Sequence, residues 1–293
     1  MMPMDFDFLR RLLKERSGLA LSPEKRYLAE SRLMPVARKA GFDTLETLIS
    51  RLRRKDSEAL VTEVVEAMTT RETLFYRDRT PFQLFRETVL PALLAARASR
   101  RHIRIWCAAC STGQEAYSLA MALREMDAAL RGWRIDILAT DLSADALSRA
   151  REGAYSQFEV QRGLPILLLI KYFTQEGERW RISPLIRNMV RFQQHNLLDS
   201  LTPLGRFDVI FCRNVLIYFD MPTKQDVLQR LAAVAEPDGF LQLGAAETVV
   251  GLSDAWRPTP ESYALYQPAA GRSSWAGAAE RAGRLSVIGK AGG

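Results

Sequence analysis

Cys107 and Cys110 lie three positions apart in the stretch "IWCAACSTGQEAYS", which runs from Ile105 to Ser118. A Cys-x-x-Cys pair is typical of thiol redox sites and of one half of a zinc site. The small residues around and after the pair are also typical of a turn that holds a nucleotide-like ligand in front of a helix. These three interpretations predict different proteins.

The redox and metal interpretations find little support elsewhere in the chain. A tryptophan before the pair is typical of thioredoxin-like sites. A zinc site, however, needs about four ligands, and Cys212, His102 and His195 show no second paired spacing. A simpler interpretation makes Cys107 a small buried residue of a strand and Cys110 a small residue of the following turn.

The nucleotide interpretation requires a strand, a tight turn and a helix whose free N–H groups face the ligand. The segment "RIWCAACSTGQEAYSLAMAL" supplies these in order, but it contains only Gly113 where a dinucleotide site would have G-x-G-x-x-G. A ligand without a pyrophosphate is therefore favoured. Asp141 closes the next β-rich run, where an acid commonly accepts hydrogen bonds from ribose hydroxyls. The alternative role for Asp141 is a helix N-cap, for which Ser143 competes.

Two patterns of hydrophobic periodicity predict the elements that position these residues. Residues 5–101 show helical spacing and no strand signal, whereas short β-rich runs alternate with helix-length segments from residue 102. This order predicts an α/β fold with a doubly wound, mainly parallel sheet that binds ligands at the carboxyl ends of its strands. The run from 263 to 268 is expected to add an antiparallel edge strand, and the Glu176–Gly177 pair indicates a small inserted hairpin.

Composition narrows the class of protein. The chain has 293 residues and 47% hydrophobic residues, which is enough for a large domain and a smaller one. The longest strongly apolar run is far shorter than a membrane span, and the start "MMPMDFDF" lacks the pattern of a secretory signal. Three cysteines make no disulfide framework, so we expect a cytoplasmic protein. A net charge of +7 favours acidic partners.

Five segments together resemble the chemotaxis receptor methyltransferase family, whose members use S-adenosylmethionine. The segments are "MTTRETLFYRD" (68–78), "WCAACSTGQEAYS", "ATDLSADALSRAREGAY", "FDVIFCRNVLIYFD" and "PDGFLQLGAAET", and the resemblance covers about residues 5–267 in order. It implies a seven-stranded class I methyltransferase sheet, preceded by a small all-helical domain and carrying a small inserted β-subdomain. We expect the helical domain at 1–80, the methyltransferase domain at 81–268, the insert at about 172–192, and a disordered tail at 269–293.

The resemblance also implies a set of site residues. The cofactor-binding residues that it predicts are Arg71, Thr73, Arg77, Glu115, Asp141, Asn196, Leu197, Arg213 and Asn214. Glu115 is suited to the cationic methionine end of the cofactor, Asp141 to the ribose, and Asn196 or the backbone beside it to adenine. Family members usually have Asn in place of Arg71, so Arg71 is alternatively directed at an acidic substrate.

In this family a glutamate carboxylate of a receptor attacks the methyl group and becomes a methyl ester, leaving S-adenosylhomocysteine; no metal is involved. A carboxylate is already ionised at neutral pH, since its reference pKa is about 4.3, so no general base is required. Tyr218, just beyond the β-rich run "FDVIFCRN", is our candidate for orienting the acceptor carboxylate beside the methyl group, and Arg77 is expected to help hold the acidic groups near the site. For Tyr218 the alternative is an aromatic residue that caps the sheet.

A basic helix is expected at about 22–40. Its Lys25, Arg26, Arg32 and Arg38 are predicted to bind the acidic, helical cytoplasmic region of a receptor, or a receptor-like signalling protein. Such a charged face is also common on helices that are simply solvated. The segment "TQEGERW" is short, which favours an enzyme that does not bind a receptor's C-terminal peptide. The chain is expected to be a monomer.

Two further functions stay open at this point. An RNA or small-molecule methyltransferase would share the cofactor fold, but the basic helix has few aromatic residues, so no nucleic acid is expected. A signalling module that binds the cofactor or its product without turnover is the second alternative, which Arg71 leaves open.

Overall fold

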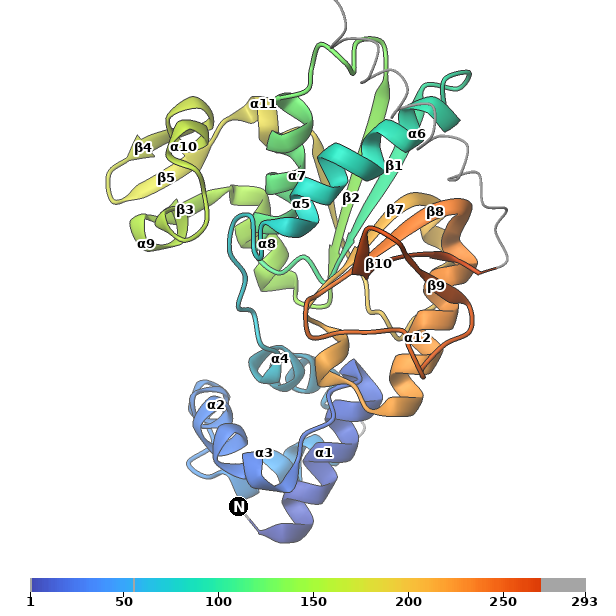
Figure 1. Ribbon diagram of the computed structural model, residues 1–293. Coiled ribbons are helices and arrows are strands. Elements are labelled where there is room, and N and C mark those ends of the chain that lie inside the picture. The colour runs from blue at the N-terminus through green and yellow to red at the C-terminus, as the bar shows by residue number, and fades with distance from the viewer. Residues whose placement is uncertain (1, 55, 270–293) are drawn as a thin grey trace, which may run out of the picture.

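The computed structural model describes residues 2–54 and 56–269, so nearly all of the tail expected at 269–293 lies outside the described residues. Four helices, α1 (Pro3–Ser17), α2 (Arg26–Lys39), α3 (Leu45–Leu52) and α4 (Glu58–Met68), pack into a small bundle, with the 3₁₀ turn η1 (Pro23–Lys25) before α2. Figure 1 shows this bundle in blue, below the rest of the molecule. Its core includes Leu9, Leu33, Leu48 and Val64, all 0% exposed, as apolar residues at helical spacing require.

A seven-stranded sheet forms the larger part of the molecule, and its strand order is β6-β2-β1-β7-β8-β10-β9. The strands are β1 (His102–Ala108), β2 (Arg134–Asp141), β6 (Val190–Gln194), β7 (Phe207–Cys212), β8 (Ala235–Leu243), β9 (Trp256–Thr259) and β10 (Ser262–Pro268). β6, β2, β1, β7 and β8 pair in parallel, and β10 is antiparallel to both β8 and β9. The antiparallel direction expected for 263–268 is confirmed. Its edge position is wrong, because β9 covers it.

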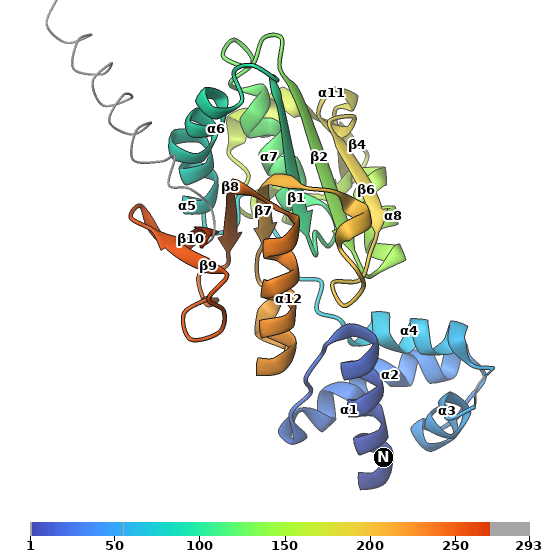
Figure 2. The same ribbon diagram turned by 90° about the vertical axis from the view of Figure 1, so that its right-hand side faces the viewer.

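Helices cover both faces of this sheet, as Figure 2 shows. Ile105 and Cys107 of β1 point into a core formed with α5 (Thr80–Leu84), the π-helical turn η2 (Phe85–Val89), α6 (Leu90–Ala96), α7 (Gln114–Arg124) and α8 (Ala144–Glu152). Trp106 and Ala108 point to the opposite core, against α12 (Met221–Val234). This alternation along β1 follows from the two-residue period of a strand. Two further 3₁₀ turns, η3 (Thr202–Leu204) and η4 (Leu216–Tyr218), lie in loops.

A second, three-stranded sheet is antiparallel, with the order β3-β5-β4. Its strands are β3 (Ala154–Ser156), β4 (Phe173–Glu176) and β5 (Arg179–Ile182), and α9 (Gln157–Gln161), α10 (Ile166–Tyr172) and α11 (Pro184–Arg187) accompany them. β4 and β5 form the hairpin around Gly177, which has φ +60°. The insert was expected at about 172–192. The small sheet starts earlier, with β3 at Ala154, and its last strand, β5, ends at Ile182. Residues 190–194 belong to the main sheet.

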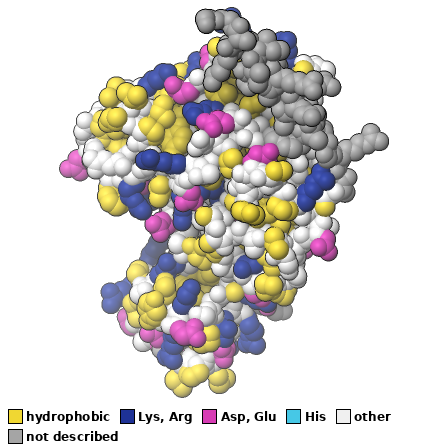
Figure 3. All heavy atoms as spheres, in the orientation of Figure 1, with side chains coloured by type: hydrophobic (Ala, Val, Ile, Leu, Met, Phe, Trp, Pro, Cys, Tyr) yellow, Lys and Arg dark blue, Asp and Glu magenta, His cyan; other side chains and the backbone are white. Residues whose placement is uncertain are grey.

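The small sheet is packed against the rest of the protein through aromatic residues and carries apolar residues on its outer side. Phe75 lies 5.0 Å from Tyr155 and 5.6 Å from Phe173 between ring centroids, in edge-on contacts. Hydrophobic side chains gather on the surface over α10, at the upper left of Figure 3.

Within the part of the chain that the structure describes, no helix is long and apolar enough to cross a membrane.

The helical bundle meets the carboxyl ends of the main strands at two places. The Ala144 N–H, at the start of α8, donates to Glu66 Oε1 of α4 at 2.7 Å. On the other side, the Ala20 N–H donates to the Tyr218 carbonyl at 2.8 Å, next to a bridge between Leu19 and Phe219. The segment between α4 and α5 runs between these contacts and carries residues 69–77 across the strand ends.

Candidate functional site

A pocket lies where the carboxyl ends of β1, β2 and β7 face residues 69–77 and the end of α1, and it encloses about 1030 Å³, part of it open to solvent. Every residue predicted to bind cofactor or orient the acceptor lines this pocket: Arg71, Thr73, Arg77, Glu115, Asp141, Asn196, Leu197, Arg213, Asn214 and Tyr218. The structure adds lining residues that were not among the predicted cofactor-binding or acceptor-orienting residues: Ser17, Leu19, Thr69, Thr70, Glu72, Ala109, Cys110, Ser111, Leu142, His195, Val215 and Phe219.

The turn after β1 contains residues with left-handed backbone. Ala109 has φ +56°, Ser111 has φ +51° and Gly113 has φ +94°, and Gly113 is the N-cap of α7. The Cys110 N–H donates to the Thr140 carbonyl of the neighbouring strand at 2.9 Å. The Gly113 N–H donates to the Cys110 carbonyl at 3.0 Å, and the Ser111 N–H donates to Asp141, so the turn is held by its own backbone and by the neighbouring strand. The order of strand, turn and helix is as the sequence predicted, and residues 109–111 of the turn line the pocket.

The cysteines around this turn are structural. Cys107 and Cys110 are free thiols, 0% and 2% exposed, and burial raises the pKa of both well above the ordinary value. A reactive thiol needs the opposite shift. Over residues 2–54 and 56–269, no group of three or more His, Cys, Asp or Glu side chains is arranged to hold a metal ion.

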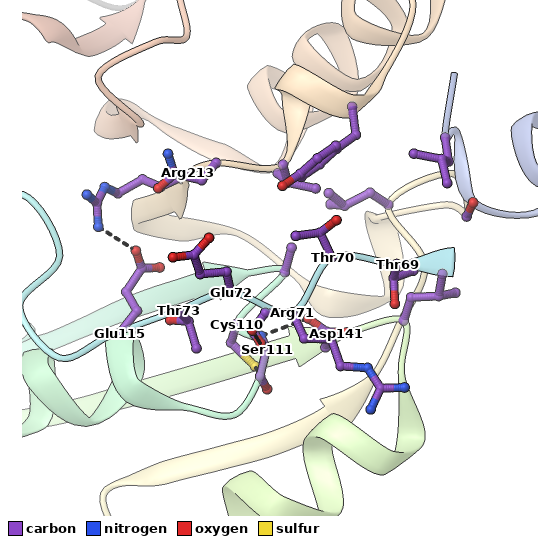
Figure 4. Close-up of a pocket in the computed structure, with 18 of the residues that line it drawn as sticks. Thr69, Thr70, Arg71, Glu72, Thr73, Cys110, Ser111, Glu115, Asp141 and Arg213 are labelled. Carbon is purple, nitrogen blue, oxygen red and sulfur yellow. Dashed lines mark hydrogen bonds and ion pairs between the residues drawn. The ribbon is translucent and has the colours of Figure 1, made fainter. Parts of the chain in front are cut away.

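Asp141 lies at the end of β2, beside the turn, as Figure 4 shows. Its Oδ2 accepts the Ser111 N–H at 2.8 Å, and its Oδ1 accepts the Ser143 N–H at 2.9 Å. Each oxygen keeps spare acceptor capacity toward the pocket. The N-cap of α8 is Ser143, whose side chain accepts the Ala146 N–H, so Asp141 is not used as the cap. Burial raises the pKa of Asp141, and the two backbone hydrogen bonds act against that shift.

Glu115, in the first turn of α7, is held by a buried arginine. Arg213 Nη1 donates to Glu115 Oε2 at 2.8 Å, a contact drawn in Figure 4. Arg213 Nη2 donates to Asp78 Oδ2 at 2.7 Å and to the Arg77 carbonyl at 2.8 Å. Burial raises the pKa of Glu115, while Arg213 lowers it. Glu115 Oε1 has no partner in the part of the chain described, so it is free to bind a ligand cation.

Arg71 lines the pocket mainly as a support for the turn. Its carbonyl accepts the Ser111 hydroxyl at 2.9 Å, while its guanidinium forms ion pairs with Asp145 and, at 3.8 Å, with Glu66. These pairs join α4 to the start of α8. Thr73 lies in the same segment and lines the pocket, as predicted.

Asn196 uses its side chain to hold the helical bundle. Its Nδ2 donates to the Arg16 carbonyl at 2.8 Å, and its Oδ1 accepts the Leu198 N–H at 3.0 Å. Backbone groups near Leu197 are therefore better placed than this side chain to contact a ligand base. His195 adds a buried Nε2 that has no hydrogen-bond partner in the described structure. Burial lowers the pKa of His195, so its ring is neutral at neutral pH.

Asn214 and Tyr218 belong to the turn after β7, which forms the opposite wall. Asn214 has φ +59°, and its N–H donates to the buried Glu247 at 2.8 Å. Tyr218 is partly exposed and ends the 3₁₀ turn η4. Glu247 was missed by the sequence reasoning, although it lies in the quoted segment "PDGFLQLGAAET".

The basic residues of α2 and η1 lie outside the pocket. Arg26 forms an ion pair with Glu30 at 3.1 Å. Arg32 donates to the Met68 carbonyl at 2.7 Å and so fastens α2 to the start of the pocket segment. Lys25 ends the short η1 turn, and Arg38 lies in the last turn of α2.

The residues present fit an adenosyl ligand. Asp141 offers acceptors for sugar hydroxyls, the unpartnered His195 nitrogen and nearby backbone offer groups for a base, and Glu115 offers a carboxylate for an ammonium group. This site, at the carboxyl ends of a parallel sheet with the observed strand order, defines a class I methyltransferase that uses S-adenosylmethionine.

Comparison with known proteins assigns the family. The family model described as "CheR methyltransferase, SAM binding domain" matches residues 71–264, and "CheR methyltransferase, all-alpha domain" matches residues 4–69. The chain belongs to the CheR methyltransferase family.

Curated relatives are similar over most of their length. The chain is 42% identical over 257 residues to chemotaxis protein methyltransferase 1 of Pseudomonas aeruginosa, covering 86% of this chain and 93% of the relative. It is 40% identical over 258 residues to chemotaxis protein methyltransferase Cher2 of Pseudomonas putida, covering 87% and 94%. Identity to the chemotaxis protein methyltransferase of Salmonella typhimurium is 34% over 248 residues, covering 83% of each chain.

Proposed function

We propose that this protein transfers the methyl group of S-adenosylmethionine to glutamate side chains of chemoreceptors, giving glutamyl methyl esters and S-adenosylhomocysteine. One observation carries the proposal: the pocket that pairs a sugar-binding acid, Asp141, with an ammonium-binding acid, Glu115, also contains Arg77 and Tyr218. An arginine and a phenol beside the cofactor suit an anionic oxygen acceptor.

The residue roles divide between the two walls. Asp141 binds the ribose hydroxyls, Glu115 binds the ammonium group through its free oxygen, and backbone groups at Asn196 and Leu197 bind adenine. The backbone of Arg71 supports the turn of residues 109–113, and Thr73 lines the pocket and contacts the cofactor. Arg213 and Asn214 hold the opposite wall, and Arg213 fixes Glu115 in place.

The cofactor supplies an electrophilic methyl group on a positively charged sulfur. The acceptor glutamate is ionised at neutral pH, so the protein holds it rather than deprotonates it. Arg77 attracts the carboxylate, and the Tyr218 hydroxyl donates a hydrogen bond that orients it. Catalysis then comes from alignment in a site that excludes water, which can contribute several kcal/mol.

The basic helix gives the receptor a place to bind outside the pocket. Lys25, Arg26 and Arg38 attract an acidic helical surface, whereas Arg32 is already used to fasten α2 to residue 68. We also propose that the domain boundary falls between the end of α4 at Met68 and the start of α5 at Thr80, because residues 69–73 and Arg77 line the pocket of the larger domain.

A labelling experiment tests the proposal. The protein is incubated with S-adenosylmethionine tritiated in the methyl group and with receptor-containing membranes, and the labelled receptor is treated with alkali. Methyl esters release volatile methanol, so the expected label is base-labile and appears on the receptor. Alkali-stable label, or label on RNA, would contradict the proposed reaction.

A further inference from the structure

Glu247 is a buried carboxylate whose hydrogen bonds all go to backbone N–H groups at the end of β8 and in the turn after β7. It is 8% exposed, and its Oε2 accepts the N–H groups of Gly244 and Asn214, both at 2.8 Å. Its Oε1 accepts the N–H groups of Val215 at 2.9 Å and Ile217 at 3.3 Å. No lysine or arginine of residues 2–54 and 56–269 forms an ion pair with it.

The turn after β7 needs this acceptor. The left-handed backbone at Asn214 ends the pairing of β7 and directs successive N–H groups away from the sheet. A buried N–H group without a partner is costly, so these groups require an acceptor from elsewhere in the chain. A carboxylate from the next strand connection meets several of them at once.

The same turn carries the acceptor wall of the pocket. Arg213, Asn214, Val215 and Tyr218 line the pocket, whereas Glu247 does not. The far end of the turn is held by the bundle, through the hydrogen bond from the Ala20 N–H to the Tyr218 carbonyl. The wall is thus held from two directions, and Glu247 provides the contact on the side of the main sheet.

The space around Gly244 also shows that the Glu247 carboxylate and the turn after β7 lie very close to the end of β8. A Cβ atom at Gly244 would lie 2.8 Å from Glu247 Oε2 and 3.0 Å from the Asn214 nitrogen. The first distance is shorter than real Cβ contacts, and the second is tighter than most of them. Glycine at residue 244 therefore leaves room for the carboxylate and the turn to meet.

We propose that Glu247 is a positioning residue for methyl transfer: it fixes the backbone of residues 214–217 and thereby places Tyr218 against the acceptor carboxylate. Glu247 contacts neither cofactor nor acceptor itself. The proposal rests on the proposed function, and it predicts loss of turnover with little loss of cofactor affinity.

The test compares Glu247→Gln with Glu236→Gln. Glutamine keeps the volume but turns one acceptor into a donor facing backbone donors. Because displacement of a reacting group by about 1 Å can cost about 100-fold, we expect kcat to fall about 100-fold, with KM for S-adenosylmethionine within about threefold of wild type. Glu236 lies in β8, the strand before the loop that carries Glu247, and forms ion pairs with Arg100 and Arg206, away from the pocket, so its variant should keep wild-type kcat.

Hydrogen exchange of the ligand-free protein gives a readout independent of activity. In Glu247→Gln, backbone N–H groups of residues 214–217 should exchange faster, while those of β7 stay protected. A kcat within about twofold of wild type, or a KM that rises as much as kcat falls, would overturn the proposal.

Two outcomes need separate treatment. If Glu247→Gln does not fold, Gly244→Ala takes its place, with the same fall in kcat expected and an unchanged kcat overturning the proposal. If wild-type protein does not methylate receptors, the proposed function fails. The hydrogen-exchange comparison still tests Glu247 by itself: unchanged exchange of residues 214–217 in Glu247→Gln would reject its positioning role.

Discussion

The two walls of the pocket are built by different means. The cofactor wall, residues 109–113 with Asp141, is held by backbone conformation and by N–H groups that meet one carboxylate. The acceptor wall, residues 213–218 with Arg77, combines such contacts, made to Glu247, with charge pairs, since Arg213 binds Glu115 and Asp78. Backbone contacts suit the cofactor, which is the same molecule in every reaction, whereas charged side chains suit the acceptor carboxylate, which arrives on another protein. Changes to the cofactor wall should therefore lower affinity, and changes to the acceptor wall should lower turnover.

The largest effect is expected for Arg77→Ala. The side chain donates to the Glu72 carbonyl at 3.1 Å and lines the pocket, so its loss should leave the fold intact. Methyl transfer at saturating cofactor should fall by about 100-fold or more, as for loss of a group that acts on the reacting charge. Steady-state rates with labelled cofactor measure this, with Arg86→Ala as the surface control. Unchanged turnover would remove Arg77 from the mechanism.

Asp141→Asn tests the cofactor wall. The amide loses an acceptor oxygen and the charge that strengthens hydrogen bonds from hydroxyl groups, so affinity for S-adenosylhomocysteine should fall about 10- to 100-fold. Calorimetric titration measures it. Asp136→Asn, at the opposite end of β2, is the matched control. An affinity equal to wild type would refute the ribose-binding role and the contrast between the walls.

Asp220→Asn tests how the acceptor wall is fastened to the bundle. Asp220 caps α12 and pairs with Lys14 at 2.5 Å, and the hydrogen bond from Lys14 is the main reason that its pKa is lowered to about 2. A lowered pKa in the folded state stabilises the fold above pH 3.8, and this contribution is lost as pH falls toward 2. Since the side chain is 28% exposed, we expect asparagine to cost about 1 kcal/mol at pH 7.

Urea unfolding of Asp220→Asn at a series of pH values checks that sign. The difference in free energy of unfolding from wild type should shrink steadily below about pH 4. A difference that grows on acidification would contradict the assignment.

The smallest effect is expected outside both walls, at the basic helix. Arg38→Ala should raise KM for the receptor about threefold without changing kcat, as for an exposed charge that attracts its partner. Arg32→Ala should instead lower the free energy of unfolding by about 1 kcal/mol, because Arg32 binds the Met68 carbonyl. Receptor titrations and urea unfolding separate the two. Equal effects of both variants on receptor KM would contradict this division.

Local patterns in the sequence were sufficient to predict the main elements and the pocket wall around Asp141. Strand and helix periods depend on near neighbours, and strand ends in a parallel sheet converge, so Cys110, Gly113 and Asp141 could be placed together. The edge position of β9 could not be predicted, because its run is short and contains Pro258.

Residues whose roles depend on distant contacts were harder to find. Glu247 binds a turn some 30 positions earlier in the chain, and Ser17 and Leu19 reach the pocket only because the bundle docks on it. The direction of the Arg71 guanidinium depends on Asp145 at the start of α8. Such pairings follow from how the domains and strand ends pack, which no local spacing encodes.

A crystal structure with S-adenosylhomocysteine tests the central claim most directly. The account predicts the ribose hydroxyls on the Asp141 carboxylate, the ammonium group at Glu115, and the sulfur facing the side of the pocket that holds Arg77 and Tyr218. Density for the ligand outside this pocket, or a sulfur turned away from Tyr218, would contradict it.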